Sequence, residues 1–166
     1  MNMGEQRLFE NLLAEYERPI LRLCYRLLGN MADAQDAAQE VFLKAHRNLD
    51  RYDPARSASP WLYQIAVNTC RDQFRRQRPA LEIVPARVTT PEEEAQTGQQ
   101  REILQRALRE LPPKEREALV LRELEGLATA EVAQMLGSTE ETVRSQVSHA
   151  KAKLKAFVER YTTRRI

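Results

Sequence analysis

The sequence predicts an all-α protein of two small helical domains, joined by a flexible linker, with a helix-turn-helix in the C-terminal domain. In both halves of the chain, apolar residues recur every three or four positions, which is the spacing of a helix with one buried face. Aromatic residues make up only 6% of the 166 residues, and this does not favour a thick sheet sandwich. Between residues 79 and 100 the periodicity stops, and three prolines and an acidic run replace it. We therefore expect domains at 1–78 and 101–166, with a linker at 79–100.

Three helical segments are expected in the N-terminal domain. The first covers residues 7–28, and Pro19 inside it is expected to kink the helix or to start a new one. Asp33 is a suitable N-cap for the second helix, which has the sequence AQDAAQEVFLKAHRNL and carries an apolar stripe. A loop with the sequence DRYDPARSASP follows. Ser59 and Pro60 then form a suitable N-cap and first residue for the third helix.

The C-terminal domain contains the spacing of a helix-turn-helix. The sequence LPP separates its first helix from the next, which should end at Gly126. Thr129 can cap a short helix that ends at Gly137, and Ser138 with Glu141 forms a capping box for the last helix. Two helices joined by a short turn that contains glycine are typical of a helix-turn-helix.

The sequence lacks the residue clusters of an enzyme. Cys24 and Cys70 lack the paired spacing of a zinc or redox site, so we expect buried free thiols. His46 and His149 are the only histidines, and no glycine-rich phosphate loop occurs. We therefore expect no metal, no cofactor, no catalytic residues and no small-molecule substrate. No apolar run reaches the length of a membrane span and the start does not resemble a signal peptide, which favours a cytoplasmic protein.

Cationic residues gather in two places although the net charge is only +2. One group lies near residue 75, and the other begins at residue 143, where seven Lys or Arg accompany one Glu. The last helix has a stripe of apolar residues: Val143, Val147, Ala150, Leu154 and Val158. Beside it runs a polar stripe: Arg144, Ser145, Ser148, His149, Lys151 and Lys155. Such a polar face suits entry into the DNA major groove, although a plain helical hairpin with a solvated face remains an alternative.

The third helix of the N-terminal domain also has a polar face that becomes cationic along its length. Gln64, Asn68, Arg71 and Arg75 stack on this face at spacings of 4, 3 and 4. An aromatic residue, Trp61, lies near its start together with Tyr63. Aromatic rings can stack on unpaired bases, amides can bond base edges and arginines can follow the backbone, so this face suits strand-separated DNA. Taken alone, the two aromatic residues are more often core or boundary residues than base-stacking ones.

The chain resembles an extracytoplasmic function (ECF) sigma factor, the minimal two-domain branch of the bacterial sigma-70 family. Two segments carry the resemblance, DAQDAAQEVFLKAHRNLDRYDPARSASPWLYQIAVNTCRDQFRR and LRELPPKEREALVLRELEGLATAEVAQMLGSTEETVRSQVSHAKAKL. They occur in the family's order and cover nearly the whole chain. The resemblance implies that the N-terminal domain binds core RNA polymerase and opens the −10 element of a promoter, and that the C-terminal domain reads the −35 element.

The resemblance also implies a role for particular residues. The positions that match the polymerase-binding surface are Asp36, Gln39, Glu40, Phe42 and Lys44, of which Phe42 also belongs to the apolar stripe. The −10 positions are Arg56, Ser57, Ser59, Trp61, Tyr63, Gln64, Asn68, Arg71 and Arg75. Asn68 is the best candidate for contact with a flipped base. The −35 positions are Arg144, Ser145, Ser148, His149 and Lys151.

Two further expectations and one alternative accompany this resemblance. Family members often carry more arginine in the −35 helix, whereas this chain has Gln146, His149 and Lys151 at those positions, so we expect a weaker grip on phosphates. An anti-sigma factor, in many cases anchored to the membrane, is expected to hold the protein inactive. The alternative is an autonomous helix-turn-helix regulator, which would explain the C-terminal domain but not the sequence SPWLYQIAVNTCRDQFRR.

Overall fold

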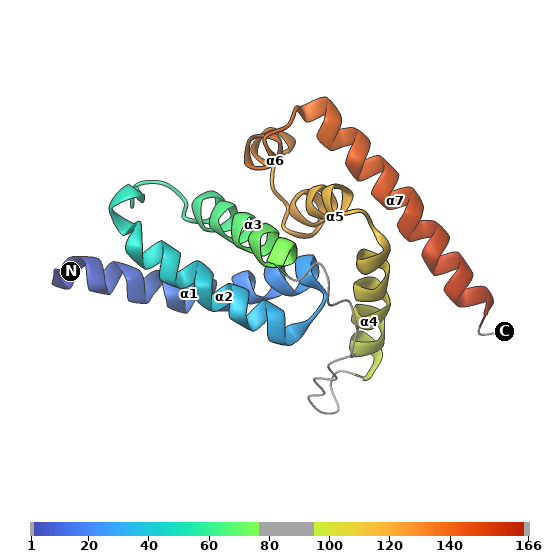
Figure 1. Cartoon of the computed structure of the whole chain (residues 1–166), viewed down its shortest axis with the longest axis horizontal. Coiled ribbons are helices and arrows are strands. Elements are labelled where there is room, and N and C mark those ends of the chain that lie inside the picture. The colour runs from blue at the N-terminus through green and yellow to red at the C-terminus, as the bar shows by residue number, and fades with distance from the viewer. Residues whose placement is uncertain (1, 77–94, 165–166) are drawn as a thin grey trace. The chain divides into compact units, whose positions relative to one another are not determined.

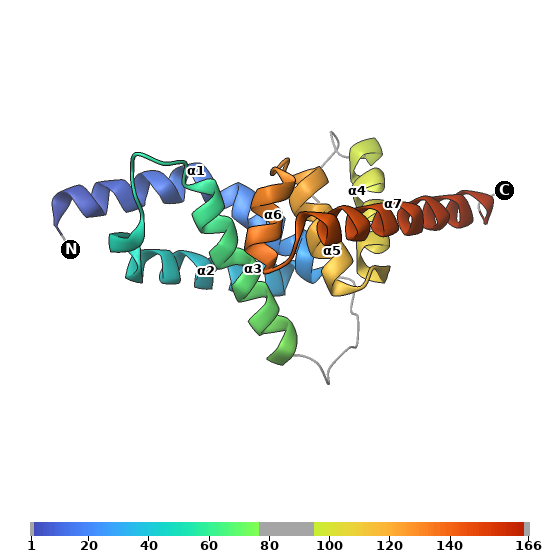
Figure 2. The same cartoon turned by 90° about the horizontal axis from the view of Figure 1, so that it is seen from above.

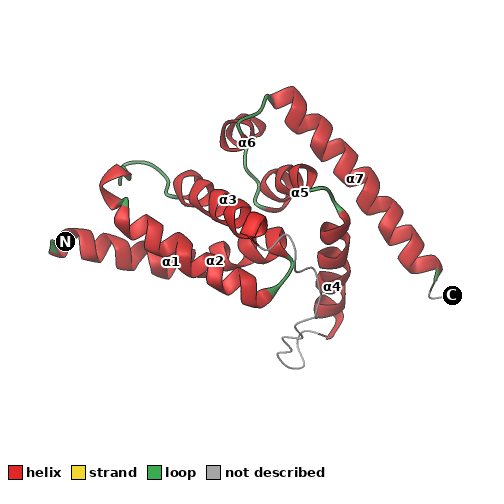
Figure 3. Cartoon of the chain, viewed as in Figure 1, coloured by secondary structure: helices red, strands yellow, loops and turns green. Residues whose placement is uncertain are grey.

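The computed structural model describes residues 2–76 and 95–164, and within these ranges every regular element is a helix (Figure 3). The chain divides into two compact units, Met1–Ala86 and Arg87–Ile166, which we call the N-terminal unit and the C-terminal unit. The predicted all-α fold of two helical domains is confirmed. Residues 79–94 of the predicted linker lie outside the described residues, and residues 95–100, also expected in the linker, belong to a helix.

Three helices and one 3-10 turn build the N-terminal unit. They are α1 (Met3–Leu28), α2 (Met31–Arg47), η1 (Leu49–Arg51) and α3 (Ser59–Arg76). Gly29, at φ 78°, ends α1 in the left-handed region and lets the chain turn into α2. Figures 1 and 2 show α1 and α2 running side by side, and α3 packs against both. The core between the three helices includes both cysteines as buried free thiols, as predicted, together with Ile20, Leu23, Val41, Leu62, Ala66 and Val67.

The structure excludes one of the two alternatives for Pro19 and corrects the predicted cap of α2. No new helix starts at Pro19, since α1 continues through it. Proline removes one backbone hydrogen bond, but residues on both sides of it, such as Leu12 and Ile20, are buried in the same core and hold one continuous helix. The cap of α2 is Asn30 rather than Asp33, because the Asn30 side chain accepts a hydrogen bond from the Asp33 backbone N–H at 3.0 Å.

The C-terminal unit contains α4 (Ala95–Glu110), α5 (Pro113–Leu119), η2 (Val120–Leu124), α6 (Thr129–Leu136) and α7 (Glu140–Thr163). The short segment η2 is a turn of π-helix that continues α5, and the chain then turns at Gly126, as predicted, with φ 71°. Helices α4, α5 and α6 each pack against α7 (Figure 1). Leu108, Leu121, Val132 and Val143 are fully buried between them.

The predicted helix-turn-helix consists of α6 and α7, although its capping residues differ from the prediction. Gly137 ends α6 in the left-handed region, as predicted. Thr129 is the first residue of α6 rather than its cap, and its hydroxyl accepts a hydrogen bond from Arg122 Nε at 3.1 Å. The backbone N–H of Ser138 bonds to Ala133 at the end of α6, so the next residue, Thr139, caps α7 instead.

A buried arginine joins the end of α4 to α5. Arg116 is only 8% exposed, and its guanidinium donates hydrogen bonds to the backbone oxygens of Leu108 (2.7 Å), Leu111 (2.9 Å) and Arg109 (3.0 Å). These carbonyls lie at the C-terminal end of α4 and just after it, where a helix lacks backbone donors for its last oxygens, and the Leu108 oxygen also accepts a hydrogen bond from the Leu111 backbone N–H. Burial lowers the pKa of Arg116, with the charge of Glu117 partly opposing that shift. The Arg116 side chain therefore holds the C-terminal end of α4 against α5.

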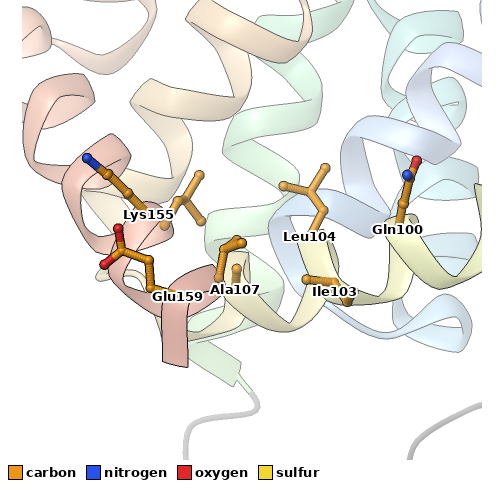
Figure 4. A pocket seen from close by; sticks show the side chains of 8 residues that line it. Gln100, Ile103, Leu104, Ala107, Lys155 and Glu159 are labelled. Carbon is orange, nitrogen blue, oxygen red and sulfur yellow. The ribbon is translucent and has the colours of Figure 1, made fainter. Parts of the chain in front are cut away.

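The apolar stripe of α7 is buried for only part of its predicted length. Val143, Val147 and Ala150 are buried, whereas Leu154 is half-buried and Val158 is 47% exposed. These last two residues border a groove of about 390 Å³ between α7 and α4 (Figure 4). The predicted buried face thus ends where α7 extends beyond α5 and α6.

Candidate nucleic-acid and polymerase surfaces

The predicted −10 face exists on α3 as a row of polar side chains opposite the core. Asn68 is exposed at its centre, and the Gln64 side-chain amide donates a hydrogen bond to Asn68 Oδ1 at 3.2 Å. Arg71, one turn further on, is half-buried, and Arg75 is exposed. The row therefore places an oriented amide before two cations along one helix face.

The loop before α3 is held by a tyrosine that the sequence analysis did not single out. Tyr52 stacks on Trp61 with ring centroids 5.1 Å apart and an angle of 20° between the rings. The Tyr52 hydroxyl donates a hydrogen bond to the backbone oxygen of Arg56 at 3.1 Å, and Ser59 donates one to the Tyr16 hydroxyl at 3.1 Å. Trp61 is half-buried, so one part of it packs on Tyr52 while another part reaches solvent.

Burial also raises the pKa of Tyr52, with smaller contributions from Tyr16, Glu15 and Asp53. The neutral phenol is therefore the favoured form in the folded protein. The sequence does hold a signal for Tyr52. It is an aromatic residue at the start of a loop that contains proline, and a second aromatic residue, Trp61, follows that loop.

Three predicted −10 residues differ in accessibility. Tyr63 is only 7% exposed and lies in the core, so it cannot stack on a base from this position. The core interpretation of Tyr63 is the correct one because its place on α3 faces the other two helices. Arg56 and Ser57 are exposed in the loop, and Arg56 lies 3.7 Å from the carboxylate of Asp53.

The predicted polymerase-binding residues lie on α2, but they do not share one exposed face. Asp36 and Gln39 are exposed and Glu40 is half-buried, whereas Phe42 is 8% exposed and packs in the core. The neighbouring Leu43 is 47% exposed. Leu43 follows Asp36, Gln39 and Glu40 by seven, four and three positions, so all four lie on the same side of the helix. The exposed apolar residue of this surface is therefore Leu43 rather than Phe42.

Lys44, the remaining predicted polymerase-binding residue, connects α2 with α3. Its ammonium donates a hydrogen bond to the Thr69 hydroxyl at 3.2 Å and lies 4.0 Å from the Asp72 carboxylate. Thr69 in turn donates to the backbone oxygen of Ile65 at 2.7 Å. This contact ties the α2 surface to the helix that carries Asn68.

The predicted −35 residues all lie on the exposed side of α7. They are Arg144, Ser145, Ser148, His149 and Lys151. Arg144 lies 3.7 Å from Glu140 one turn earlier, and Lys151 forms an ion pair of 3.0 Å with Glu123 of η2. Gln146, which stands where the family often has arginine, is half-buried with its Oε1 buried, so it faces inward rather than toward DNA.

Within the described ranges, no three His, Cys, Asp or Glu side chains are grouped so that they could hold a metal ion. In the same part of the chain, no helix is both long enough and apolar enough to cross a membrane.

Both halves of the chain match known families. A family model described as Sigma-70 region 2 matches residues 12–80, and one described as Sigma-70, region 4 matches residues 101–154. The chain is 35% identical to the ECF RNA polymerase sigma factor SigM of Mycobacterium tuberculosis, over 91% of this chain and 77% of that protein. The chain belongs to the ECF sigma factors of the sigma-70 family. The ECF sigma factor SigW of Bacillus subtilis is 29% identical, over 92% of this chain and 89% of its own length.

A solved structure supports the same family. The structure of CnrH in complex with the cytosolic domain of CnrY has a TM-score of 0.70 with this chain, at 27% identity, and the match covers 93% of this chain and 89% of CnrH. The resemblance seen in the sequence is thus confirmed. As an ECF sigma factor, the protein directs RNA polymerase to promoters and is not an enzyme. The alternative of an autonomous helix-turn-helix regulator leaves the region 2 match unexplained.

Proposed function

We propose that this ECF sigma factor divides promoter recognition between two helices that face DNA. Helix α3 traps an unpaired base of the −10 element, and helix α7 reads the −35 element in duplex DNA. The observation that carries the proposal is the row on α3, where an exposed amide at Asn68 precedes two arginines on the side opposite the core.

On α3, each part of the row suits a different part of single-stranded DNA. The Asn68 amide can donate to and accept from the edge of a flipped base, and the Gln64 amide holds it in place. Arg71 and Arg75 can follow the phosphates of the same strand. Trp61 offers a ring on which a base can stack, and Tyr52 packs against this ring.

On α7, short polar side chains accompany one long cation at the N-terminal end of the helix. Arg144 can bond a guanine edge in two places, and Ser145, Ser148 and His149 can contact neighbouring base edges or phosphates. Lys151 lies two turns after Arg144, at a position that suits a phosphate at the groove edge. Each such contact contributes little, so we expect the free protein to bind promoter DNA poorly and to bind strongly only with core polymerase.

The α2 surface is proposed to bind core RNA polymerase, through Asp36, Gln39, Glu40, Lys44 and Leu43. An exposed apolar side chain beside polar residues matches the apolar core and polar rim of a protein interface. We also propose that the protein acts in the cytoplasm and that an anti-sigma factor holds it there, at the inner face of the membrane where that factor is anchored. CnrH was solved in complex with the cytosolic domain of CnrY, and RpoE of Bartonella quintana, which has a similar fold, was solved with the anti-sigma factor NepR; these complexes support an anti-sigma partner.

Run-off transcription tests the proposal. Core polymerase freed of sigma factor is mixed with fragmented DNA of the source genome and with wild-type protein, Asn68→Ala or the matched control Asn11→Ala. Asn11 is an exposed asparagine of α1. Discrete transcripts are expected with wild type and Asn11→Ala, and transcripts reduced about fivefold or more with Asn68→Ala, because loss of a base contact costs about 1–3 kcal/mol. If Asn68→Ala supported as much transcription as Asn11→Ala, Asn68 would not belong to the proposed site.

A further inference from the structure

A polar hollow of about 360 Å³ lies where η2, the first residue of α6 and the middle of α7 meet. Three cations line it, namely Arg122, Arg144 and Lys151, together with one carboxylate, that of Glu123. The Lys151 ammonium lies 3.0 Å from Glu123 Oε1, and the two side chains are 57% and 38% exposed. Neither partner is held by burial, so the pair can open at little cost.

The Glu123 carboxylate lies at the end of the α7 surface that is proposed to face DNA. Arg144, Ser148 and Lys151 follow one another at spacings of four and three residues and lie on one side of α7. A DNA phosphate that approaches Lys151 therefore meets the negative charge of Glu123 at the same place. Two anions cannot both pair closely with one ammonium without repelling each other.

We propose that Glu123 occupies Lys151 in the free protein, and that a backbone phosphate of duplex DNA takes its place when α7 enters the major groove. This inference rests on the proposed role of α7. The exchange breaks the ion pair between Lys151 and Glu123 and forms one between Lys151 and the phosphate. DNA binding therefore gains less free energy than it would from a lysine that had no ion pair in the free protein. Because the contact is to phosphate, Glu123 lowers affinity for every duplex sequence alike. It is thus a residue that limits non-specific binding of the free sigma factor.

The chain contains a matched pair for comparison. Lys153 of α7 lies 2.9 Å from Glu115 of α5, and this pair also joins α7 to an earlier helix. Lys153 follows Lys151 by two positions and so points to a different side of α7. Glu115→Gln therefore changes the net charge by the same amount as Glu123→Gln without touching the surface proposed to face DNA.

The test measures binding of the full-length variants to a fluorescently labelled duplex of random sequence, by anisotropy at low and high salt. Glu123→Gln is expected to bind about two- to fivefold more tightly at low salt, the range set by one exposed ion pair. Glu115→Gln is expected to bind as the wild type does, and the gain of Glu123→Gln shrinks in high salt. In a Lys151→Gln background, Glu123→Gln should change binding no more than Glu115→Gln does. Glu123→Ala should reproduce the gain, and far-UV circular dichroism checks that each variant is folded.

The inference is overturned if Glu123→Gln and Glu123→Ala bind no more tightly than Glu115→Gln, or if their gain persists without Lys151. The proposed function has a separate readout, because the wild type either does or does not initiate transcription with core polymerase. If the wild type initiates transcription but Glu123→Gln binds the duplex no more tightly than Glu115→Gln, only the inference about Glu123 fails. A wild type that fails to initiate ends both.

Discussion

Replacement of Arg116 by methionine should destabilise the C-terminal unit and leave the N-terminal unit unchanged. The guanidinium makes three hydrogen bonds to backbone oxygens at 2.7 to 3.0 Å, and the side chain is 8% exposed. Bonds from a charged donor contribute about 1.5 kcal/mol each at the low end, or about 4.5 kcal/mol together. The cost of burying the charge, which also lowers the pKa of Arg116, offsets part of this sum. We expect a net loss of roughly 3 kcal/mol of unfolding free energy.

The two units can be followed separately in urea. Trp61 is the only tryptophan and lies in the N-terminal unit, so its fluorescence reports that unit, whereas circular dichroism reports the helices of both. With a slope of about 1 kcal/mol/M for a unit of this size, the C-terminal transition should move down by roughly 3 M. The Trp61 transition should not move. Arg106→Met is the control, since Arg106 is exposed and forms an ion pair of 2.8 Å with the exposed Glu102.

Two results would refute this reasoning. If Arg116→Met shifted the dichroism transition no further than Arg106→Met, the three carbonyls would have found other partners, and the Arg116 hydrogen bonds would contribute nothing to the stability of the C-terminal unit. If the Trp61 transition moved together with the dichroism transition, the two units would unfold as one, and their separate description would be wrong.

Three more predictions follow from the N-terminal unit. Leu43→Glu should weaken binding to core polymerase about tenfold or more in a competition assay without lowering stability, whereas Met3→Glu, at an 86% exposed residue of α1, should change neither. Tyr52→Leu removes the stack on Trp61 and should shift the tryptophan emission to longer wavelength at a cost of about 1 kcal/mol, and Tyr52→Phe should keep the emission of the wild type. Because burial raises the pKa of Tyr52, its phenol ionises more readily in the unfolded chain, so the stability it contributes should fall as the pH rises through about 10. The alkaline loss of stability should therefore be smaller in Tyr52→Phe, as urea unfolding at a series of alkaline pH values would measure.

Periodicity was sufficient to predict most of the helices and the two faces proposed to bind DNA, although α4 begins at Ala95, inside the predicted linker. The apolar stripes of α2 and of the first half of α7 are buried as predicted, because a regular spacing leaves only one side of each helix able to face a core. The polar rows around Asn68 and Arg144 are exposed as a direct consequence. Helix caps were harder to predict, since Asn30 and Asp33 are both good caps and the choice depends on where the preceding helix ends.

The residues that sequence reasoning misplaced depend on contacts between distant segments. Phe42 and Leu43 are neighbours with similar apolarity, and only the packing of α1 and α3 decides that the first is buried and the second exposed. Tyr52 lies nine positions before Trp61, a separation that no helical or strand period connects. Arginine is usually exposed, and the burial of Arg116 depends on three backbone oxygens near the end of α4 that accept its hydrogen bonds.

The central claim is that α3 traps a base only after α2 has joined the protein to core polymerase. Permanganate reactivity of thymines tests it directly, on a promoter fragment found by run-off transcription. Wild-type protein with core polymerase should expose reactive thymines in the −10 element. Asn68→Ala should form the polymerase complex without that reactivity, and Leu43→Glu should form less of the complex and show correspondingly less reactivity. Thymines opened by the protein without polymerase, or opened equally by Asn68→Ala, would contradict the account.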